Sequence, residues 1–267
     1  DNYDITNLGA ILFAKDLSNF PTVKRKSVRV IVYETDSKSK REKEQEGKHG
    51  YAVSFESLVS YVMDQLPQNE VITEAFRKEM KMYPEVALRE FVANALIHQD
   101  LSITGAGPTI EIFPNRIEIT NTGEPLIDTE RFIDHPPRSR NEDLASFMRQ
   151  IGICEEGGTG VDRALTEIAI YQLPAPSFER FDQFTKITLY SHKELRDMTI
   201  SDKVRACYQH CVLKYVENSR MTNASLRERL GIGEKNYPAA SAIIKATLEA
   251  GSIKESEKPR EYVPIWA

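Results

Sequence analysis

Residues 83–100 read Tyr83-Pro-Glu-Val-Ala-Leu-Arg-Glu-Phe-Val-Ala-Asn-Ala-Leu-Ile-His-Gln-Asp100, and they carry the strongest helix signal in the chain. A proline suits the first turn of a helix, and the apolar residues after it recur at helical spacing, which predicts a helix over residues 85–98. Glu90, Asn94 and His98 are four residues apart and form a row along this helix. The row lies beside the apolar stripe, so we expect it to border the core.

Glu90 and Asn94 are chemically suited to linked tasks. An amide oxygen can complete a Mg²⁺ shell that is otherwise phosphate and water. A carboxylate can orient or deprotonate an attacking water. The pair by itself favours a plainer interpretation, in which Glu90 pairs with an arginine and Asn94 is a surface or cap residue.

Two glycine-containing turns add further signals. Gly157-Gly-Thr-Gly160 precedes a predicted helix over residues 161–171, and such a turn lets backbone N–H groups approach an anion, although many such turns are only caps. Asn121-Thr-Gly123 directly follows a predicted strand, where a polar side chain can read an adenine edge or simply form a turn. The chain contains no GxxxxGK[ST] loop, which excludes a P-loop motor within it.

Periodicity predicts the remaining elements around these motifs. Helices are expected near Leu8–Phe13 and over residues 55–66 and 144–151, and strands over residues 27–33, 109–113, 116–120 and 184–190. Residues 37–50 carry charges of both signs without periodicity and are expected to form a solvated loop or hairpin tip. Residues 126–141 are expected to be irregular.

Residues 201–267 have the pattern of a separate unit. Helices are expected over residues 202–217, after a cap at Thr222 or Asn223, and from Pro238 to Gly251, followed by a hairpin of residues 253–256 and 261–265. This order is that of a winged helix. The unit holds 11 Lys and Arg against 8 Asp and Glu, a charge of +3, whereas the other 200 residues hold 24 against 32, a charge of −8. The contrast is a weak hint of nucleic-acid contact by this unit.

The bulk composition limits the class of protein. The 267 residues are enough for one large domain or two ordinary ones, and no apolar run is long enough for a membrane helix or a signal peptide. Three cysteines without a framework spacing indicate a reducing, cytoplasmic setting. Cys207, His210 and Cys211 suggest zinc, but they lack a fourth ligand, so ordinary helix positions are favoured. Because the chain opens with Asp1, we expect a fragment of a longer protein.

The three motifs together resemble the GHKL superfamily of gyrase, heat-shock chaperone, histidine-kinase and mismatch-repair ATPases. The matching boxes are Glu90-Phe-Val-Ala-Asn94-Ala95, Asn121-Thr-Gly123 and Gly158-Thr-Gly160. The chain more closely resembles a bacterial and archaeal family of transcriptional regulators, often labelled RecG-like helicases. That resemblance is carried by residues 83–90 and 94–100, Arg116-Ile-Glu-Ile, Ser139-Arg-Asn141 and Gly157-Gly-Thr-Gly-Val-Asp-Arg163.

The resemblance implies an α+β fold, with a GHKL-type α/β sandwich in which helices lie on one face of a mixed sheet, followed by a winged helix-turn-helix domain. The implied organisation is a lead-in segment over residues 1–82, a GHKL core over 83–192 with an open lid around 126–157, and a winged helix over 200–267. An AlbA/Schlafen-like (divergent-AAA) domain would precede this fragment. The implied function is an ATP- and DNA-binding regulator with slow Mg²⁺-dependent hydrolysis. The alternative is a non-enzymatic DNA- or protein-binding scaffold with a degenerate pocket.

The resemblance also implies roles for single residues. Glu90 takes the general-base position and Asn94 the Mg²⁺ position, while Gly157, Gly158, Thr159 and Gly160 wrap the phosphates. Asn121 stands where an adenine-reading Asp is usual, with Gly123 admitting the adenine and Thr185 near it. Arg140 and Asn141 lie on the lid-like segment. Three departures stand out: Asn121 replaces Asp, Pro125 replaces a second glycine, and the lid contains no lysine for a γ-phosphate.

The third helix of the predicted winged helix would enter the DNA major groove. The candidate contacts are Lys235, Asn236, Tyr237, Ser241 and Lys245, with Lys258 and Arg260 touching phosphates from the wing tip. A protein–protein module is the alternative for this unit. Homodimerisation is expected, because GHKL proteins and winged-helix regulators often dimerise.

Overall fold

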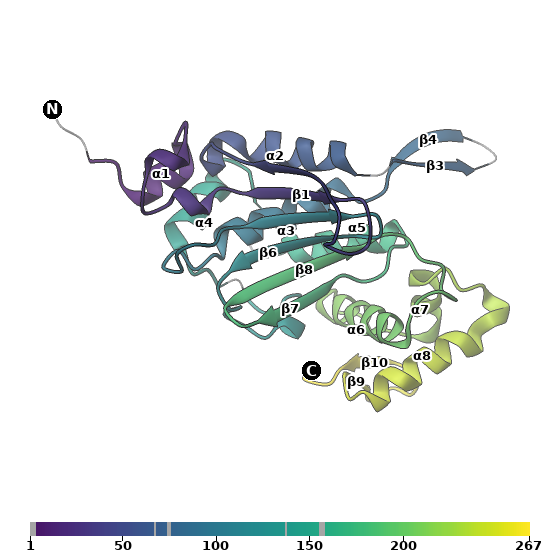
Figure 1. Cartoon of the computed structure of the whole chain (residues 1–267). Coiled ribbons are helices and arrows are strands. Elements are labelled where there is room, and N and C mark those ends of the chain that lie inside the picture. The colour runs from purple at the N-terminus through teal and green to yellow at the C-terminus, as the bar shows by residue number, and fades with distance from the viewer. Residues whose placement is uncertain (1–3, 67, 74–75, 137, 155–157) are drawn as a thin grey trace.

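The computed structural model describes residues 4–66, 68–73, 76–136, 138–154 and 158–267. Its largest element is a six-stranded mixed sheet with the order β2-β1-β5-β6-β8-β7 (Figure 1). The strands are β1 Arg29–Tyr33, β2 Arg41–Glu46, β5 Thr109–Phe113, β6 Arg116–Thr122, β7 Ser177–Phe181 and β8 Phe184–Tyr190. β1 and β5 are parallel, and every other neighbouring pair is antiparallel. The expectation of an α+β fold built on a mixed sheet is therefore confirmed.

One face of this sheet is covered by helices (Figure 1). The helices of this part are α1 Asn7–Phe13, α2 Tyr51–Gln65, α3 Glu85–Ile97, α4 Glu142–Gln150 and α5 Gly160–Ile170. α3 packs against β6, α2 and α5. A separate hairpin, β3 Gln68–Thr73 and β4 Phe76–Lys81, projects from the body between α2 and α3.

The sequence of α3 explains its central place. Pro84 stands at the N-cap position, and the chain leaves the helix at His98. The predicted stripe is buried, with Leu88 and Phe91 both at 0% exposure. Burying such a side chain contributes roughly 1.5–3 kcal/mol. The helix is therefore held rigidly against the sheet, and the row of Glu90 and Asn94 is fixed with it.

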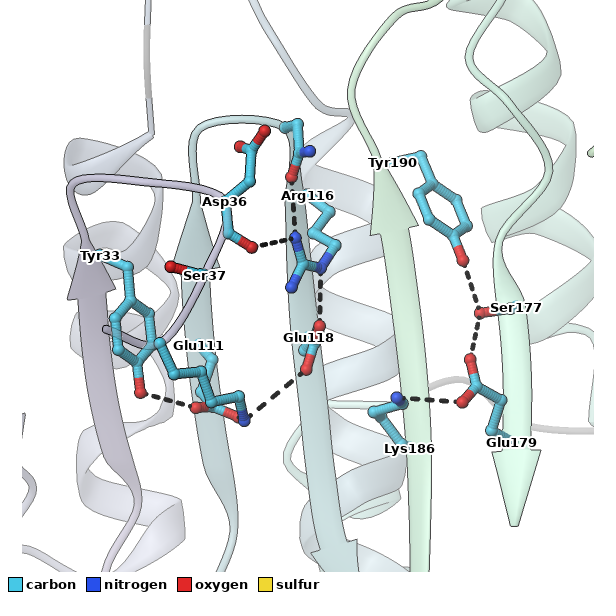
Figure 2. A network of polar contacts seen from close by, with 12 residues as sticks. Tyr33, Asp36, Ser37, Glu111, Arg116, Glu118, Ser177, Glu179, Lys186 and Tyr190 are labelled. Carbon is cyan, nitrogen blue, oxygen red and sulfur yellow. Dashed lines mark hydrogen bonds and ion pairs between the residues drawn. The ribbon is translucent and has the colours of Figure 1, made fainter. Parts of the chain in front are cut away.

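The opposite face of the sheet carries a network of polar side chains (Figure 2). Glu111 and Glu118 are only 7% and 8% exposed. Lys38 bridges them at 2.6 and 3.9 Å, and the Tyr33 hydroxyl donates to Glu111 at 2.9 Å. The Arg116 guanidinium donates to Glu118 at 2.6 Å. These carboxylates are thus neutralised by neighbours on the same face, as buried charges require.

The C-terminal unit, residues 200–267, consists of three helices followed by a short hairpin. Its elements are α6 Ile200–Val216, α7 Asn223–Arg229, α8 Tyr237–Glu249, β9 Ile253–Glu255 and β10 Tyr262–Pro264. Capping boxes start the first two helices, at Thr199 with Asp202 and at Thr222 with Ser225. Of the two alternatives for the second cap, Thr222 is the residue used.

Hydrogen bonds join this C-terminal unit to backbone carbonyls of the sheet domain, in segments that lie before and after α5 in the sequence. Gln209 donates to the Pro176 carbonyl at 2.8 Å, and Arg229 donates to the Leu173 carbonyl at 2.9 Å. The Tyr208 hydroxyl donates to the Glu130 carbonyl at 2.9 Å. No helix in the described part of the chain combines the length and apolar character that crossing a bilayer requires.

Several local expectations were incomplete. The loop expected at residues 37–50 contains strand β2, which pairs with β1 at the sheet edge. All six of its residues are exposed, so no apolar alternation marks it. Asn121 and Thr122 belong to β6 rather than to a turn. Strand β7 was not predicted, because three of its five residues are exposed at the other edge.

Candidate nucleotide site

A cavity of about 850 Å³ opens between the helical layer and the end of the sheet. Its walls come from α3, from the ends of β6 and β8, from residues 124–149 and from the start of α5. Cavities that hold drug-sized ligands and cofactors have this size and this mixture of apolar walls with a few polar groups. The polar wall residues include Glu90, Asn94, His98, Asn121, Ser139, Cys154 and Thr185.

Glu90 and Asn94 meet the glycine turn at one end of this cavity. The Asn94 amide nitrogen donates to Glu90 Oε1 at 2.8 Å. A Cβ at Gly160 would lie under 3.0 Å from all three atoms of the Glu90 carboxyl, so any larger residue would force the carboxyl out of its present position. Burial raises the pKa of Glu90, while Asn94 and the charge of Arg163 oppose the rise. The structure therefore brings α3 and the start of α5 together, as the motif order suggested.

Another part of the cavity wall is formed by two strands. Asn121 on β6 and Thr185 on β8 are cross-strand partners, and both line the cavity. Asn121 is 4% exposed, and its amide nitrogen donates to the Thr122 carbonyl at 3.0 Å. The carbonyl oxygen is then the atom of this side chain suited to accept a hydrogen bond from a ligand. Thr185 Oγ1 donates to the Gly123 carbonyl at 2.7 Å.

Gly123 has a structural reason to be glycine. Its φ is +109°, and a Cβ there would meet the backbone nitrogen of Asp100 at 2.9 Å. Gly123 is not among the described residues that line the cavity. The positive φ and the close approach of Asp100 thus give this position a structural need for glycine, and its role toward an adenine stays a prediction.

Arg140 and Asn141 lie beside the cavity rather than in its wall. Arg140 donates to the Glu124 carbonyl at 2.7 Å and pairs with Asp100 at 3.4 Å. Asn141 donates to the carbonyls of Ile97 and Gln99 at 2.7 and 2.8 Å. These bonds anchor the chain before α4 to the end of α3. Their geometry supports a positioning role and gives no support to direct contact with a ligand.

The glycine turn itself is only partly described. Gly158 lines the cavity, whereas Thr159 is exposed at the N-cap position of α5. Gly157 lies outside the described residues. The anion-binding prediction for this turn therefore depends on Gly158 and on the first N–H groups of α5.

Some residues that line the cavity were not predicted from the sequence. Arg138, Arg149 and Cys154 all line the cavity. Burial raises the pKa of the Cys154 thiol, with a further contribution from Glu90. His98, the third residue of the predicted helical row, also lines the cavity. Burial, aided by Arg140, lowers its pKa to about 4, so it is neutral at pH 7.

The residues present fit a magnesium nucleotide. Because the Asn94 nitrogen is bonded to Glu90, the Asn94 oxygen is the atom left to face a cation, and an amide oxygen is a ligand that Mg²⁺ accepts. Asn121 and Thr185 offer polar groups to a base, between apolar walls that include Phe91 and Ile187.

The residues proposed to contact DNA all lie on the surface of the C-terminal unit. Lys235, Asn236, Tyr237, Ser241, Lys245, Lys258 and Arg260 are exposed. Asn223 donates to the Tyr237 carbonyl at 3.1 Å and to Ser241 Oγ at 3.0 Å, which ties α7 to the start of α8. Cys207 and Cys211 are buried in α6, and among the described residues no group of three metal-ligating side chains is found.

The part of the chain that contains the strands and loops of the site matches a known protein family. Residues 105–189 match a family described as "Putative ATP-dependent DNA helicase recG C-terminal". This stretch is similar to a HATPase-like, RecG-related domain. The RecG-like stretch includes Asn121, Gly158 and Thr185, and it begins after Glu90 and Asn94.

One solved structure has a similar fold over nearly the whole chain. The DIP2311 protein from Corynebacterium diphtheriae has a TM-score of 0.60 and 17% identity, with 96% of this chain and 56% of that chain covered. The chain thus spans little more than half the length of that protein, and at this identity the likeness shows the fold alone. No curated protein matches the chain.

Proposed function

We propose that this chain is part of an ATP-binding, DNA-binding transcriptional regulator, with slow Mg²⁺-dependent hydrolysis. The observation that carries the nucleotide part is the convergence of Glu90, Asn94 and Gly160 in the wall of a cavity that Asn121 and Thr185 also line. Bound ATP and Mg²⁺ would supply the phosphoryl chemistry. Glu90 would orient the attacking water and accept its proton, and a pKa raised by burial suits that role.

The DNA part of the proposal is supported by the element order of the C-terminal unit. Three helices followed by a two-stranded hairpin is the order of a winged helix, with α8 as the recognition helix and residues 256–261 as the wing tip. Lys235, in the turn before α8, and Tyr237, the first residue of α8, are exposed and of types that contact phosphates and bases. We further propose that the full protein is a cytoplasmic homodimer with an upstream AlbA/Schlafen-like domain.

A regulator needs contact between its two functional parts, and residues 129–135 supply one. Phe132 and His135 line the cavity. From the same segment, the Arg131 guanidinium lies 4.1 Å from the Trp266 ring of the C-terminal unit. The Trp266 indole nitrogen donates to the Tyr208 hydroxyl at 3.2 Å, and that hydroxyl donates to Glu130. A ligand that moves this segment would therefore strain the attachment of the C-terminal unit.

Titration calorimetry with ATP and MgCl₂ tests the nucleotide proposal. Wild type is expected to bind, and Asn94→Ala is expected to bind at least tenfold more weakly, because it loses a metal ligand. Asn19→Ala, an exposed asparagine outside the cavity, is the matched control and keeps wild-type affinity. Absence of binding by wild type, or equal binding by Asn94→Ala, contradicts the proposal.

Fluorescence anisotropy with labelled duplexes over a range of salt concentrations tests the DNA proposal. Lys235→Ala is expected to weaken binding and to reduce the slope of log affinity against log salt by about one. Lys48→Ala, an exposed lysine in the sheet domain, keeps the wild-type slope. Equal slopes for the two variants contradict DNA contact by the turn that leads into α8.

A non-enzymatic scaffold is the second candidate. The observations that favour it are the amide of Asn121 in place of a carboxylate, Pro125 in the cavity wall, and an excess of carboxylates over arginines among the residues that line the cavity. This candidate predicts no phosphate release from ATP and an unchanged cellular phenotype for Glu90→Gln. The regulator proposal predicts slow phosphate release that Glu90→Gln abolishes.

A further inference from the structure

The charge balance of the cavity raises the question of which side chain neutralises a nucleotide's phosphates. Glu90, Glu124, Glu142 and Asp143 all line it. The segment from residue 126 to residue 154 contains no lysine, and its cations are four arginines. An anionic ligand in this cavity therefore depends on one or more of those arginines.

Two of the four arginines are engaged elsewhere. Arg131 forms an ion pair with Asp134 at 2.5 Å and faces Trp266. Arg140 is bonded to Asp100 and to the Glu124 carbonyl. Neither lines the cavity.

The remaining two, Arg138 and Arg149, line the cavity with exposed side chains. Within the described part of the chain, neither makes a side-chain hydrogen bond or an ion pair. An exposed arginine without a partner can turn toward a ligand without breaking an existing bond. The five N–H donors of its planar group match phosphate oxygens in pairs.

Arg149 is the arginine that a regular element holds beside the cavity. It stands in the last turn of α4, and the Ile153 nitrogen donates to the Met148 carbonyl at 3.0 Å, which turns the chain before Cys154 back onto that end of the helix. Arg149, Cys154 and Glu90 all line the cavity. Arg138 follows His135 and Pro136 on the irregular segment before α4, which also lines the cavity.

We propose that Arg149 is the specificity-determining cation of this cavity, which pairs with the terminal phosphate of a nucleoside triphosphate. The inference rests on the proposed nucleotide function and adds a residue to it. An arginine pairs with the γ-phosphate of a triphosphate and has no such partner on a monophosphate. Arg149 then adds to the preference for ATP over AMP that a Mg²⁺ ion held by Asn94 would give.

The test compares the affinities of ATP and AMP, each with MgCl₂, for wild type, Arg149→Gln and Arg138→Gln. Arg149→Gln is expected to weaken ATP binding about ten- to a hundredfold and to leave AMP binding unchanged, since a charge-assisted hydrogen bond is worth roughly 1.5–3 kcal/mol. Arg149→Lys keeps the charge and recovers part of the loss. Arg196→Gln, a residue 85% exposed outside the cavity, is the control with the same change of charge and keeps the wild-type ratio.

Each contrary outcome has its own meaning. An unchanged ATP-to-AMP ratio in Arg149→Gln overturns the inference while leaving the proposed function intact. A loss of preference in Arg138→Gln alone also overturns it, because the other arginine is then the phosphate partner. Equal weakening of ATP and AMP would indicate a structural role for Arg149 and overturns it as well. Absence of binding of either nucleotide by wild type overturns the proposed function and this inference together.

Discussion

Gly160→Ala adds one carbon at the point where α5 meets α3. Gly160 is buried at the first position of α5, and its φ is not in the left-handed region, so the backbone itself accepts alanine. In a helix interior alanine is favoured over glycine by roughly 1 kcal/mol, and the gain is smaller at the first position. The obstacle is the Glu90 carboxyl, which a Cβ would approach to under 3.0 Å.

The carboxyl is the far end of a flexible side chain, so it can yield. It must retreat by roughly 1 Å or more to reach an ordinary contact, and this movement breaks its 2.8 Å bond from Asn94. That hydrogen bond contributes about 0.5–1.5 kcal/mol, which offsets the gain in helix propensity. We therefore expect the free energy of unfolding to change by less than about 1 kcal/mol. If Glu90 is the proposed general base, a displacement of this size lowers the rate of hydrolysis by about 100-fold.

Urea unfolding and phosphate release from ATP are the two assays. Gly160→Ala is expected to unfold at nearly the wild-type urea concentration and to lose nearly all Mg²⁺-dependent phosphate release. Gly233→Ala is the control, because a Cβ at Gly233 meets nothing within 4 Å. A Gly160→Ala protein with wild-type hydrolysis would refute the contact between Glu90 and Gly160. A loss of more than about 3 kcal/mol would show that the backbone, rather than the carboxyl, has to move.

Three other predictions concern groups around the site. Lys26→Met should destabilise the fold by about 3 kcal/mol in urea unfolding, because the buried ammonium of Lys26 donates to three backbone carbonyls that would lose their donor. Burial and nearby carboxylates raise the pKa of Asp162 to about 6, so the folded protein loses stability as the pH rises from about 4 through 6. Asp162→Asn should therefore add on the order of 1 kcal/mol to the free energy of unfolding at pH 8, after solvent screening, and little at pH 4. Equal effects at the two pH values in urea unfolding would refute this. A double-mutant cycle of Arg131→Ala and Trp266→Ala should give a coupling of about 0.5–1 kcal/mol, and strict additivity would show that the stacked pair contributes nothing.

Local signals in the sequence were enough to predict α3, the β5–β6 hairpin and the helices of the C-terminal unit. Each of these has a strong period or a capping residue of its own, such as the stripe of Leu88 and Phe91 or the cap at Thr222. Strands β2 and β7 carried no such signal. They lie at the sheet edges, where exposed residues have no apolar alternation.

Residue types and their order along the chain identified the elements of the site, because Glu90, Asn94 and the glycine turn carry recognisable chemistry at short spacing. Which side chains share the cavity was decided by the tertiary structure alone. Gly160 approaches Glu90, Arg149 lines the same cavity, and Asn141 donates to the Ile97 carbonyl. These arrangements involve residues that are more than 40 positions apart or on different helices. Local periodicity contains no information about such distances, since they are set by how α3, α4 and α5 pack on the sheet.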